Sequence, residues 1–73
     1  ADMAARQRLA RTRAAIAALP DRQRRAILLR ASAELSTAEI AATLGTSEGA
    51  VEQLLVRARN TLRRAIEGED PPQ

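Results

Sequence analysis

Residues 36–59 read STAEIAATLGTSEGAVEQLLVRAR, and this stretch decides the fold. Ser36 followed three residues later by Glu39 forms a capping box, which predicts the start of a helix. Gly45 is the residue type best suited to leave a helix through a positive φ angle. Ser47 is a second N-cap signal, and an amphipathic pattern begins directly after it. A short helix, a turn with glycine and a longer second helix predict a helix-turn-helix.

The second helix of this motif has an apolar stripe opposite a polar face. The stripe recurs every three or four residues and consists of Val51, Leu55, Ala58, Leu62 and Ile66. The opposite face carries Gln53, Arg57, Asn60 and Arg64. Amide and guanidinium groups are the side chains that bind adenine and guanine edges in the major groove. This face therefore predicts a surface for DNA, although a charged face is also normal for any solvated helix.

The remaining chain extends the prediction to an all-α fold of four helices. We expect helices over residues 3–18, 21–33, 37–44 and 48–66, in one compact domain spanning residues 1–67. Asp2 is placed to cap the first helix, and Leu19-Pro20-Asp21 separates it from the second. Nothing in the sequence marks a sharp end for the second helix. Gly68 and two prolines follow the last helix, so we expect a disordered tail over residues 68–73.

Apolar residues predict which sides of the first two helices are buried. In the first helix the predicted stripe is Ala5, Leu9, Thr12, Ile16 and Leu19. In the second helix the broad apolar side is Ile27, Leu28, Leu29 and Ala31. The chain has no aromatic residue, so its core must be built from aliphatic side chains and alanine. A core of this kind in 73 residues is small and gives modest stability.

The charge and the missing residue types limit the function classes. The net charge is +3, and all twelve basic residues are arginine, which binds phosphate and guanine bidentately but is also favoured by a GC-rich genome. The sequence lacks His and Cys, a glycine-rich phosphate loop and paired carboxylates, so we expect neither an enzyme nor a metal or cofactor site. No apolar run approaches the ~20 residues of a membrane span. We expect a cytoplasmic protein with no membrane contact.

The geometry of a helix-turn-helix divides the candidate DNA contacts into two groups. The N-terminal part of the second helix enters the major groove, and later residues are better placed for phosphates. The candidates nearest the bases are Glu48, Glu52, Gln53, Val56 and Arg57. Those nearer the backbone are Arg59, Arg63 and Arg64, with Asn60 on the same polar face.

Several short segments resemble a known family. They are Leu19-Pro20-Asp21-Arg22-Gln23-Arg24, Ile27-Leu28-Leu29-Arg30, Leu35-Ser36, Glu39-Ile40-Ala41, Leu44-Gly45, Ser47-Glu48-Gly49-Ala50-Val51, Leu55, Arg57-Ala58-Arg59 and Leu62-Arg63. Together they resemble region 4 of bacterial sigma factors, within the extracytoplasmic-function group of the sigma-70 family. The resemblance covers about residues 5–66, and the Leu-Pro opening and the Arg-Ala-Arg close are its most specific parts.

The resemblance implies a role in transcription initiation. Region 4 binds the −35 promoter element through the major groove and contacts the flap of the RNA polymerase β subunit, and in this group an anti-sigma factor often holds it. By position, the groove-facing residues fall on Glu52, Gln53 and Arg57, with Arg59 near the backbone. Ser36 and Thr37 at the start of the third helix would approach a phosphate, as helix N-termini do.

Two departures from the family pattern keep other interpretations open. Many members have Lys or Arg where this chain has Glu52, and Arg where it has Leu54. A carboxylate repels phosphate but can accept a hydrogen bond from cytosine N4. One alternative is a sigma mimic that binds an anti-sigma factor and not DNA. Another is a LuxR-type output domain, which lacks the Leu-Pro entry and the Arg-Ala-Arg exit.

The lack of aromatic residues also excludes one role in promoter opening. Holding single strands normally uses aromatic side chains on which bases stack, and this chain has none. We therefore expect promoter melting to reside in another part of a longer protein, upstream of Ala1.

Overall fold

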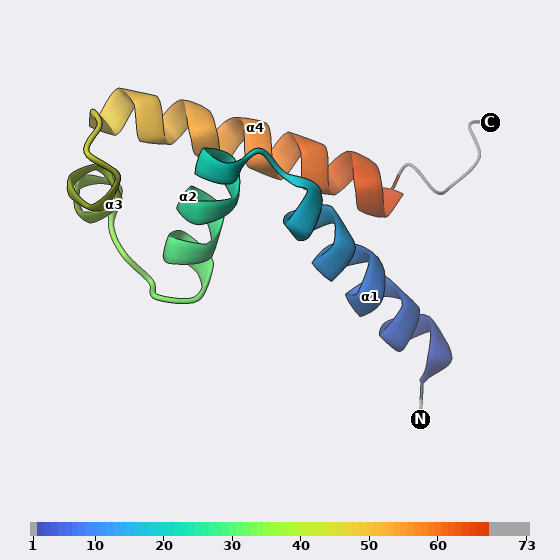
Figure 1. Cartoon of the computed structure of the whole chain (residues 1–73). Helices are drawn as coiled ribbons and strands as arrows, with labels where there is room; N and C mark the ends of the chain where they lie inside the picture. Colours follow the sequence, from blue (N-terminus) through green and yellow to red (C-terminus); the bar gives the residue numbers. More distant parts are fainter. Residues whose placement is uncertain (1, 68–73) are drawn as a thin grey trace.

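The computed structural model describes residues 2–67, and all of its regular structure is helical (Figure 1). The elements are α1 (Met3–Ala18), α2 (Asp21–Ala31), α3 (Thr37–Leu44) and α4 (Glu48–Glu67). The all-α prediction of four helices is confirmed, with α2 two residues shorter than predicted and α4 one residue longer. The tail predicted to be disordered, residues 68–73, lies outside the described residues.

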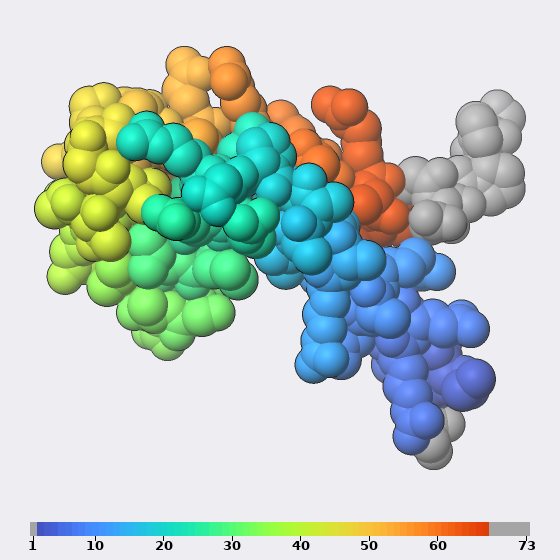
Figure 2. Space-filling view, viewed as in Figure 1, coloured from blue at the N-terminus to red at the C-terminus, as the bar shows by residue number. Residues whose placement is uncertain are grey.

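Helix α4 is the element against which the other three helices pack. Helices α2 and α3 lie beside its N-terminal half, and the C-terminal end of α1 lies closer to its middle (Figure 1). From there α1 diverges, so that its first turns project away from the body of the molecule (Figure 2). The helix-turn-helix is thus supported on one side by α2, while α1 stands apart from α3.

The core lies where α2, α3 and the first half of α4 meet. It consists of Ala26, Ile40, Ala41, Val51 and Leu55, with Ile27, Leu29, Leu35, Leu44 and Leu54 packed against it. Ile40 and Val51 are completely buried and are the largest such side chains in the described chain. The predicted stripe of α4 is confirmed as buried at Val51, Leu55 and Ala58. Leu62 and Ile66 are only half-buried, because only α1 packs near them.

The predicted stripe of α1 is wrong at Ala5 and Leu9 but agrees with the structure from Thr12 onwards. Along Met3–Ala18 no side chain is fully buried, and Leu9 is 52% exposed. Ile16 is half-buried, and Leu19, just after the helix, is buried at 3% exposure. The reason is that α1 has α4 as its main packing partner and moves away from it towards its N-terminus. Partial burial is therefore confined to the second half of α1, at Thr12 and Ile16 of the stripe, and Leu19 completes it.

The apolar side of α2 also differs from the prediction. Leu28 is 40% exposed and Ala31 is exposed, whereas Ala26 is completely buried. Ala26 was not among the residues predicted to face the core. An alanine at this place lets two helix backbones approach closely, which suits a core without aromatic side chains. The amphipathic pattern of α2 indicated a helix but not the direction in which it faces.

The connection from α2 to α3 turns at a left-handed residue that is not glycine, so neither glycine nor proline marks it in the sequence. Glu34 takes the left-handed conformation with φ 57°, and the N–H of Leu35 donates to the carbonyl of Leu29 at 3.1 Å. The bond joins Leu35 to a carbonyl six residues earlier, and the left-handed position before it is one that glycine normally occupies. Leu29 and Leu35 both pack against the core, and this packing compensates for the strained backbone at Glu34.

The predicted caps of the helix-turn-helix are all present. Ser36 and Glu39 form the capping box of α3. Gly45 ends α3 in the left-handed conformation with φ 68°, and its N–H points back to the carbonyls of Ala41 and Ala42. The N–H of Ala50 donates to the hydroxyl of Ser47 at 3.1 Å, which caps α4. These local bonds fix the angle at which α4 leaves the turn.

Candidate nucleic-acid interface

Four of the predicted base-contacting residues share one groove on the exposed side of α4. Glu52, Gln53, Val56 and Arg57, together with Gly49, line a shallow open groove of about 580 Å³. The four side chains are exposed, and Val56 is 53% exposed in spite of being apolar. An exposed helix face carrying amide, guanidinium and carboxylate groups is the surface that a DNA major groove accommodates.

A second groove of about 500 Å³ adjoins the first and is shared between two helices. Its lining from α4 and the preceding turn is Ser47, Gly49, Ala50, Gln53, Leu54 and Arg57. The remaining lining residue is Arg22, which comes from α2 and was not among the predicted candidates. No local sequence pattern relates the first turn of α2 to the face of α4, so this neighbour follows from the packing alone.

Leu54 has a different place from the one that the family pattern suggested. It lies at the second groove but is half-buried and packs against the core. Val56 is therefore the more exposed of these two neighbouring apolar side chains. Leu54 contributes to the fold. Many members of the family have an arginine at this position, so the edge of the groove lacks that charge here.

The other predicted contacts lie outside these two grooves. Glu48 is exposed at the first position of α4, and Arg59, Asn60 and Arg64 are exposed further along the helix. Arg63 donates from Nη1 to Oδ1 of Asn60 at 3.3 Å. The distribution separates the side chains that line the grooves near the start of α4 from a row of polar and basic groups towards its end.

The start of α3 forms a separate polar cluster. The hydroxyl of Ser36 accepts from the N–H of Glu39, and Oγ1 of Thr37 accepts from Nη2 of the half-buried Arg30 at 2.5 Å. Each hydroxyl still has its own hydrogen to donate to a phosphate oxygen. The hydrogen bonds from the backbone and side chain of Ser36 lower the pKa of Glu39 below its ordinary value of 4.5. The Glu39 carboxylate is therefore held in its charged form by the backbone and hydroxyl of Ser36.

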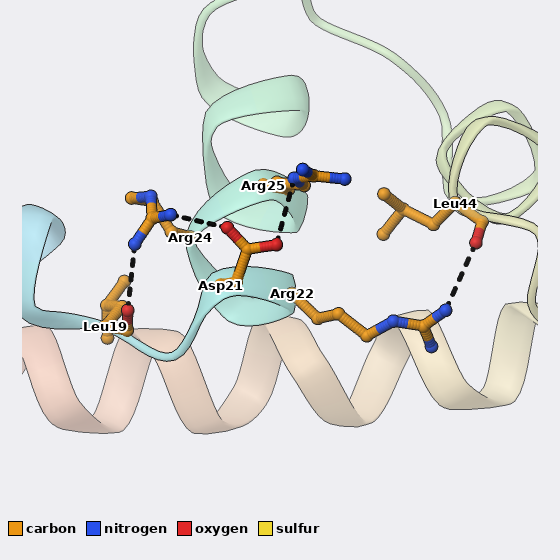
Figure 3. A network of polar contacts seen from close by, with 6 residues as sticks. All are labelled: Leu19, Asp21, Arg22, Arg24, Arg25 and Leu44. Atoms are coloured by element: carbon orange, nitrogen blue, oxygen red, sulfur yellow. Dashed lines mark hydrogen bonds and ion pairs between the residues drawn. The ribbon is translucent and has the colours of Figure 1, made fainter.

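Two arginines of α2 are occupied by ion pairs. Asp21 binds Nη2 of Arg24 at 2.5 Å and Nε of Arg25 at 3.1 Å (Figure 3). Arg24 also donates to the carbonyl of Leu19 at 3.1 Å, so it ties the start of α2 to the α1–α2 connection. These contacts give Arg24 and Arg25 a structural role at the start of α2.

A third groove differs in chemistry from the two on α4. It lies between α2 and α3, has a volume of about 330 Å³ and is lined by Arg25, Leu28, Leu29, Thr43 and Leu44. Its lining is mainly aliphatic, which suits a protein surface better than a phosphate backbone. Over residues 2–67 we find no cluster of three or more potential metal ligands. Within the same span, none of the helices is both long and apolar enough to cross a membrane.

Comparison with known proteins agrees with this geometry. Residues 9–62, which include the whole helix-turn-helix, match the family described as Sigma-70, region 4. No curated protein and no solved structure shows a significant match to the chain. The family resemblance seen in the sequence is confirmed by this match, which covers most of the chain. The chain therefore belongs to the sigma-70 region 4 family of DNA-binding helix-turn-helix domains, which recognise promoters in bacterial transcription initiation.

Proposed function

We propose that this domain recognises the −35 promoter element, within a sigma factor of the extracytoplasmic-function group, by inserting the first half of α4 into the major groove. The observation that carries the proposal is that Gln53 and Arg57 stand one helical turn apart and line the same two grooves. The region 4 family match supports it. A sigma domain works on polymerase and promoter DNA, so we infer that it acts in the bacterial cytoplasm.

The side chains of α4 suit distinct parts of the DNA. Arg57 fits guanine O6 and N7, Gln53 fits adenine N6 and N7, and Glu52 accepts from cytosine N4. Glu48 and Val56 border these contacts, and the methyl groups of Val56 fit the thymine methyl. Binding to backbone phosphates is assigned to Arg59, Asn60 and Arg64 on α4, and to Ser36 and Thr37 at the start of α3.

A binding selection from random duplexes tests the proposal, whatever the sequence of the promoter. The chain is incubated with duplexes randomised over six base pairs, and the enriched sequence is then titrated against a scrambled duplex by fluorescence anisotropy. We expect one enriched element, with an affinity that falls linearly with salt on a log–log scale. Recovery of no enriched element from a chain that is folded by circular dichroism would overturn specific promoter recognition.

Arg57→Ala then tests the role of the central side chain. Losing a bidentate contact costs about 1–3 kcal/mol of discrimination at one base pair. The expected result is a relaxed preference at a single position, with little change for the scrambled duplex. Arg6→Gln is the matched control, because Arg6 is an exposed residue of α1 in the part that projects from the body. If Arg57→Ala keeps the full base preference at every position, Arg57 does not contact a base.

For the polymerase, we propose that the β-subunit flap binds the aliphatic groove between α2 and α3. The support is that this groove is separate from the α4 face and exposes Leu28 at its surface. Leu28→Glu should abolish association with the polymerase core in a pull-down and leave duplex affinity unchanged. Retained association would exclude this groove as the contact.

The second candidate function is an interaction module that binds an anti-sigma factor and not DNA. The observation that favours it is that the carboxylate of Glu52 lines the same groove as Arg57. An anti-sigma factor is also a proposed partner of a DNA-binding domain, so its binding alone does not separate the two. Capture of an anti-sigma factor together with no duplex affinity at low salt would establish the second function. The family match favours both promoter recognition and the anti-sigma-binding module over a LuxR-type output domain.

A further inference from the structure

The buried side chains of the domain form two groups. Those of α2, α3 and the first half of α4 make up the core, to which Met3–Ala18 of α1 contributes no residue. Leu19 and Ala58 are also buried, at 3% and 0% exposure, but lie outside this core. Leu19 directly follows α1, and Ala58 is at the middle of α4, which the end of α1 approaches (Figure 1). The contact between α1 and α4 is therefore a second, smaller layer beside the core.

One narrow face holds α1 in this layer. Its half-buried residues are Arg11, Thr12, Ala15 and Ile16, whereas every residue from 2 to 10 is exposed. Their spacing places them on one side of the helix, and α4 is the main packing partner of α1. An isolated helix of 16 residues is only marginally stable in water. The order of α1 therefore depends on this contact.

The same face contains a charge that lacks a partner. Arg11 is half-buried, and its Nε is buried with no hydrogen-bond partner among residues 2–67. The ion pairs found in that span are made by Asp21 with two arginines of α2, and none includes a residue of α1. Taking a cation out of water without a partner costs free energy. Arg11 therefore weakens the contact that holds α1 against α4.

The helices that meet here do not balance this charge. Between Met3 and Ala18 the sequence has no acidic residue. The second half of α4, beside which α1 lies, has one acidic residue, Glu67, and three arginines, Arg59, Arg63 and Arg64. Like charges on neighbouring helices repel each other. The surroundings of Arg11 consequently oppose the packing of α1 as well.

We propose that α1 is a strap that opens from α4 and closes on it while the helix-turn-helix stays folded, and that Arg11 keeps the closed state weak. Opening breaks the smaller layer at Leu19 and Ile16 but leaves the core intact, so it costs less free energy than global unfolding. The two grooves on α4 have no lining residue from α1 and keep their shape in the open state. The strap thus changes one side of the molecule without altering the grooves. The proposal does not depend on DNA binding.

Native-state amide hydrogen exchange followed by NMR tests the strap. With urea added below the unfolding transition, the amides of residues 12–18 should open at lower free energy than those of Ala26 and Leu55 in the core. Their opening should also depend less on urea, because a local opening exposes less surface than global unfolding. Equal free energies and equal urea slopes for the two sets of amides would overturn the strap.

Two substitutions distinguish local from global opening. Ile16→Ala removes a half-buried contact of α1 that both routes break, so it should speed exchange at both sets of amides about tenfold. Ile40→Val loosens the core, which only global unfolding breaks. It should speed exchange at Ala26 and Leu55 about fivefold and leave residues 12–18 unchanged. Equally faster exchange of residues 12–18 in Ile40→Val would show that α1 opens only together with the whole domain.

Arg11→Met tests the role of the charge. Methionine keeps an unbranched apolar side chain with a similar helix propensity. Without the charge, exchange at residues 12–18 should slow about threefold. Arg6→Met is the matched control, because it removes the same charge from an exposed position of α1 and should change exchange little. Unchanged exchange in Arg11→Met, or equal slowing in Arg6→Met, would overturn the role of Arg11.

Discussion

Ser36 and Glu39 each bond to the backbone of the other at the start of α3. The N–H of Glu39 donates to the Ser36 hydroxyl at 3.1 Å, and the N–H of Ser36 donates to the Glu39 carboxylate at 2.7 Å. Helix α3 has eight residues, far fewer than an isolated helix needs to be stable in water. Its existence depends on this cap and on the burial of Ile40 and Ala41.

Removing the hydroxyl of the cap should destabilise the whole domain. Ser36→Ala leaves the N–H of Glu39 without its acceptor, at a cost of about 1 kcal/mol. Urea unfolding followed by circular dichroism measures the change in free energy. Ser32→Ala is the matched control, since no hydrogen bond of its hydroxyl is found within the described residues. Equal unfolding midpoints for the two variants would show that the capping bond contributes nothing.

Stability should also fall in acid because of Glu39. Hydrogen bonds from Ser36 lower the pKa of the Glu39 carboxyl below its ordinary value of 4.5 in the folded state. A lowered folded-state pKa means that the stabilisation is fully present above the unfolded-state value and is lost as the pH falls through the folded-state value. Thermal unfolding midpoints measured from neutral pH downwards should therefore decline more steeply for the wild type than for Glu39→Gln. Parallel curves would contradict the assignment.

The two glycines of the helix-turn-helix should respond oppositely to substitution by alanine. Gly45 has φ +68°, so Gly45→Ala places a side chain in the left-handed region and costs about 1–2 kcal/mol of stability. Gly49 is helical, and an added Cβ would meet no atom within 4 Å. Gly49→Ala should accordingly stabilise the fold by about 0.5–1 kcal/mol. Urea titrations showing the same sign for both would refute the distinction.

Gly49→Ala has a second expected effect, on DNA binding. Gly49 lines both grooves on α4, so the added methyl group occupies space at the proposed DNA interface. A more stable domain with weaker duplex binding is the expected combination, measured by anisotropy on the same preparation. Wild-type affinity in this variant would show that DNA does not approach the first turn of α4 closely.

The carboxylate of Glu52 should lower the affinity for DNA in general and raise the preference for cytosine at one position. It lines the groove with Arg57, where it repels phosphate but can accept from cytosine N4. Glu52→Ala should bind the scrambled duplex more tightly and lose preference for cytosine at one position. Glu67→Ala removes the same charge from the other end of α4 and is the control. Equal changes in duplex affinity for Glu52→Ala and Glu67→Ala would show that Glu52 acts only through the net charge of the domain.

Features set by neighbouring residues were predictable from the sequence. The caps at Asp2, Ser36 and Ser47 and the left-handed turn at Gly45 all appear where the sequence places them. Each depends on hydrogen bonds within a few residues, so the local sequence contains all the necessary information. The same holds for the face of α4 that carries Gln53 and Arg57, because helical periodicity places them together.

Tertiary structure alone decided which faces are covered. The apolar pattern did not reveal that Leu9 and Leu28 are exposed while Ala26 is buried, because burial depends on how α1 and α2 pack against α4. It also did not indicate that Arg22 would border the groove of Arg57, 35 residues later in the numbering. The sequence by itself therefore determined the helices, their caps and the family, since these are local properties. The packing of the helices determined the core and the second wall of the groove beside α4, because contacts between distant segments exist only once the chain has folded.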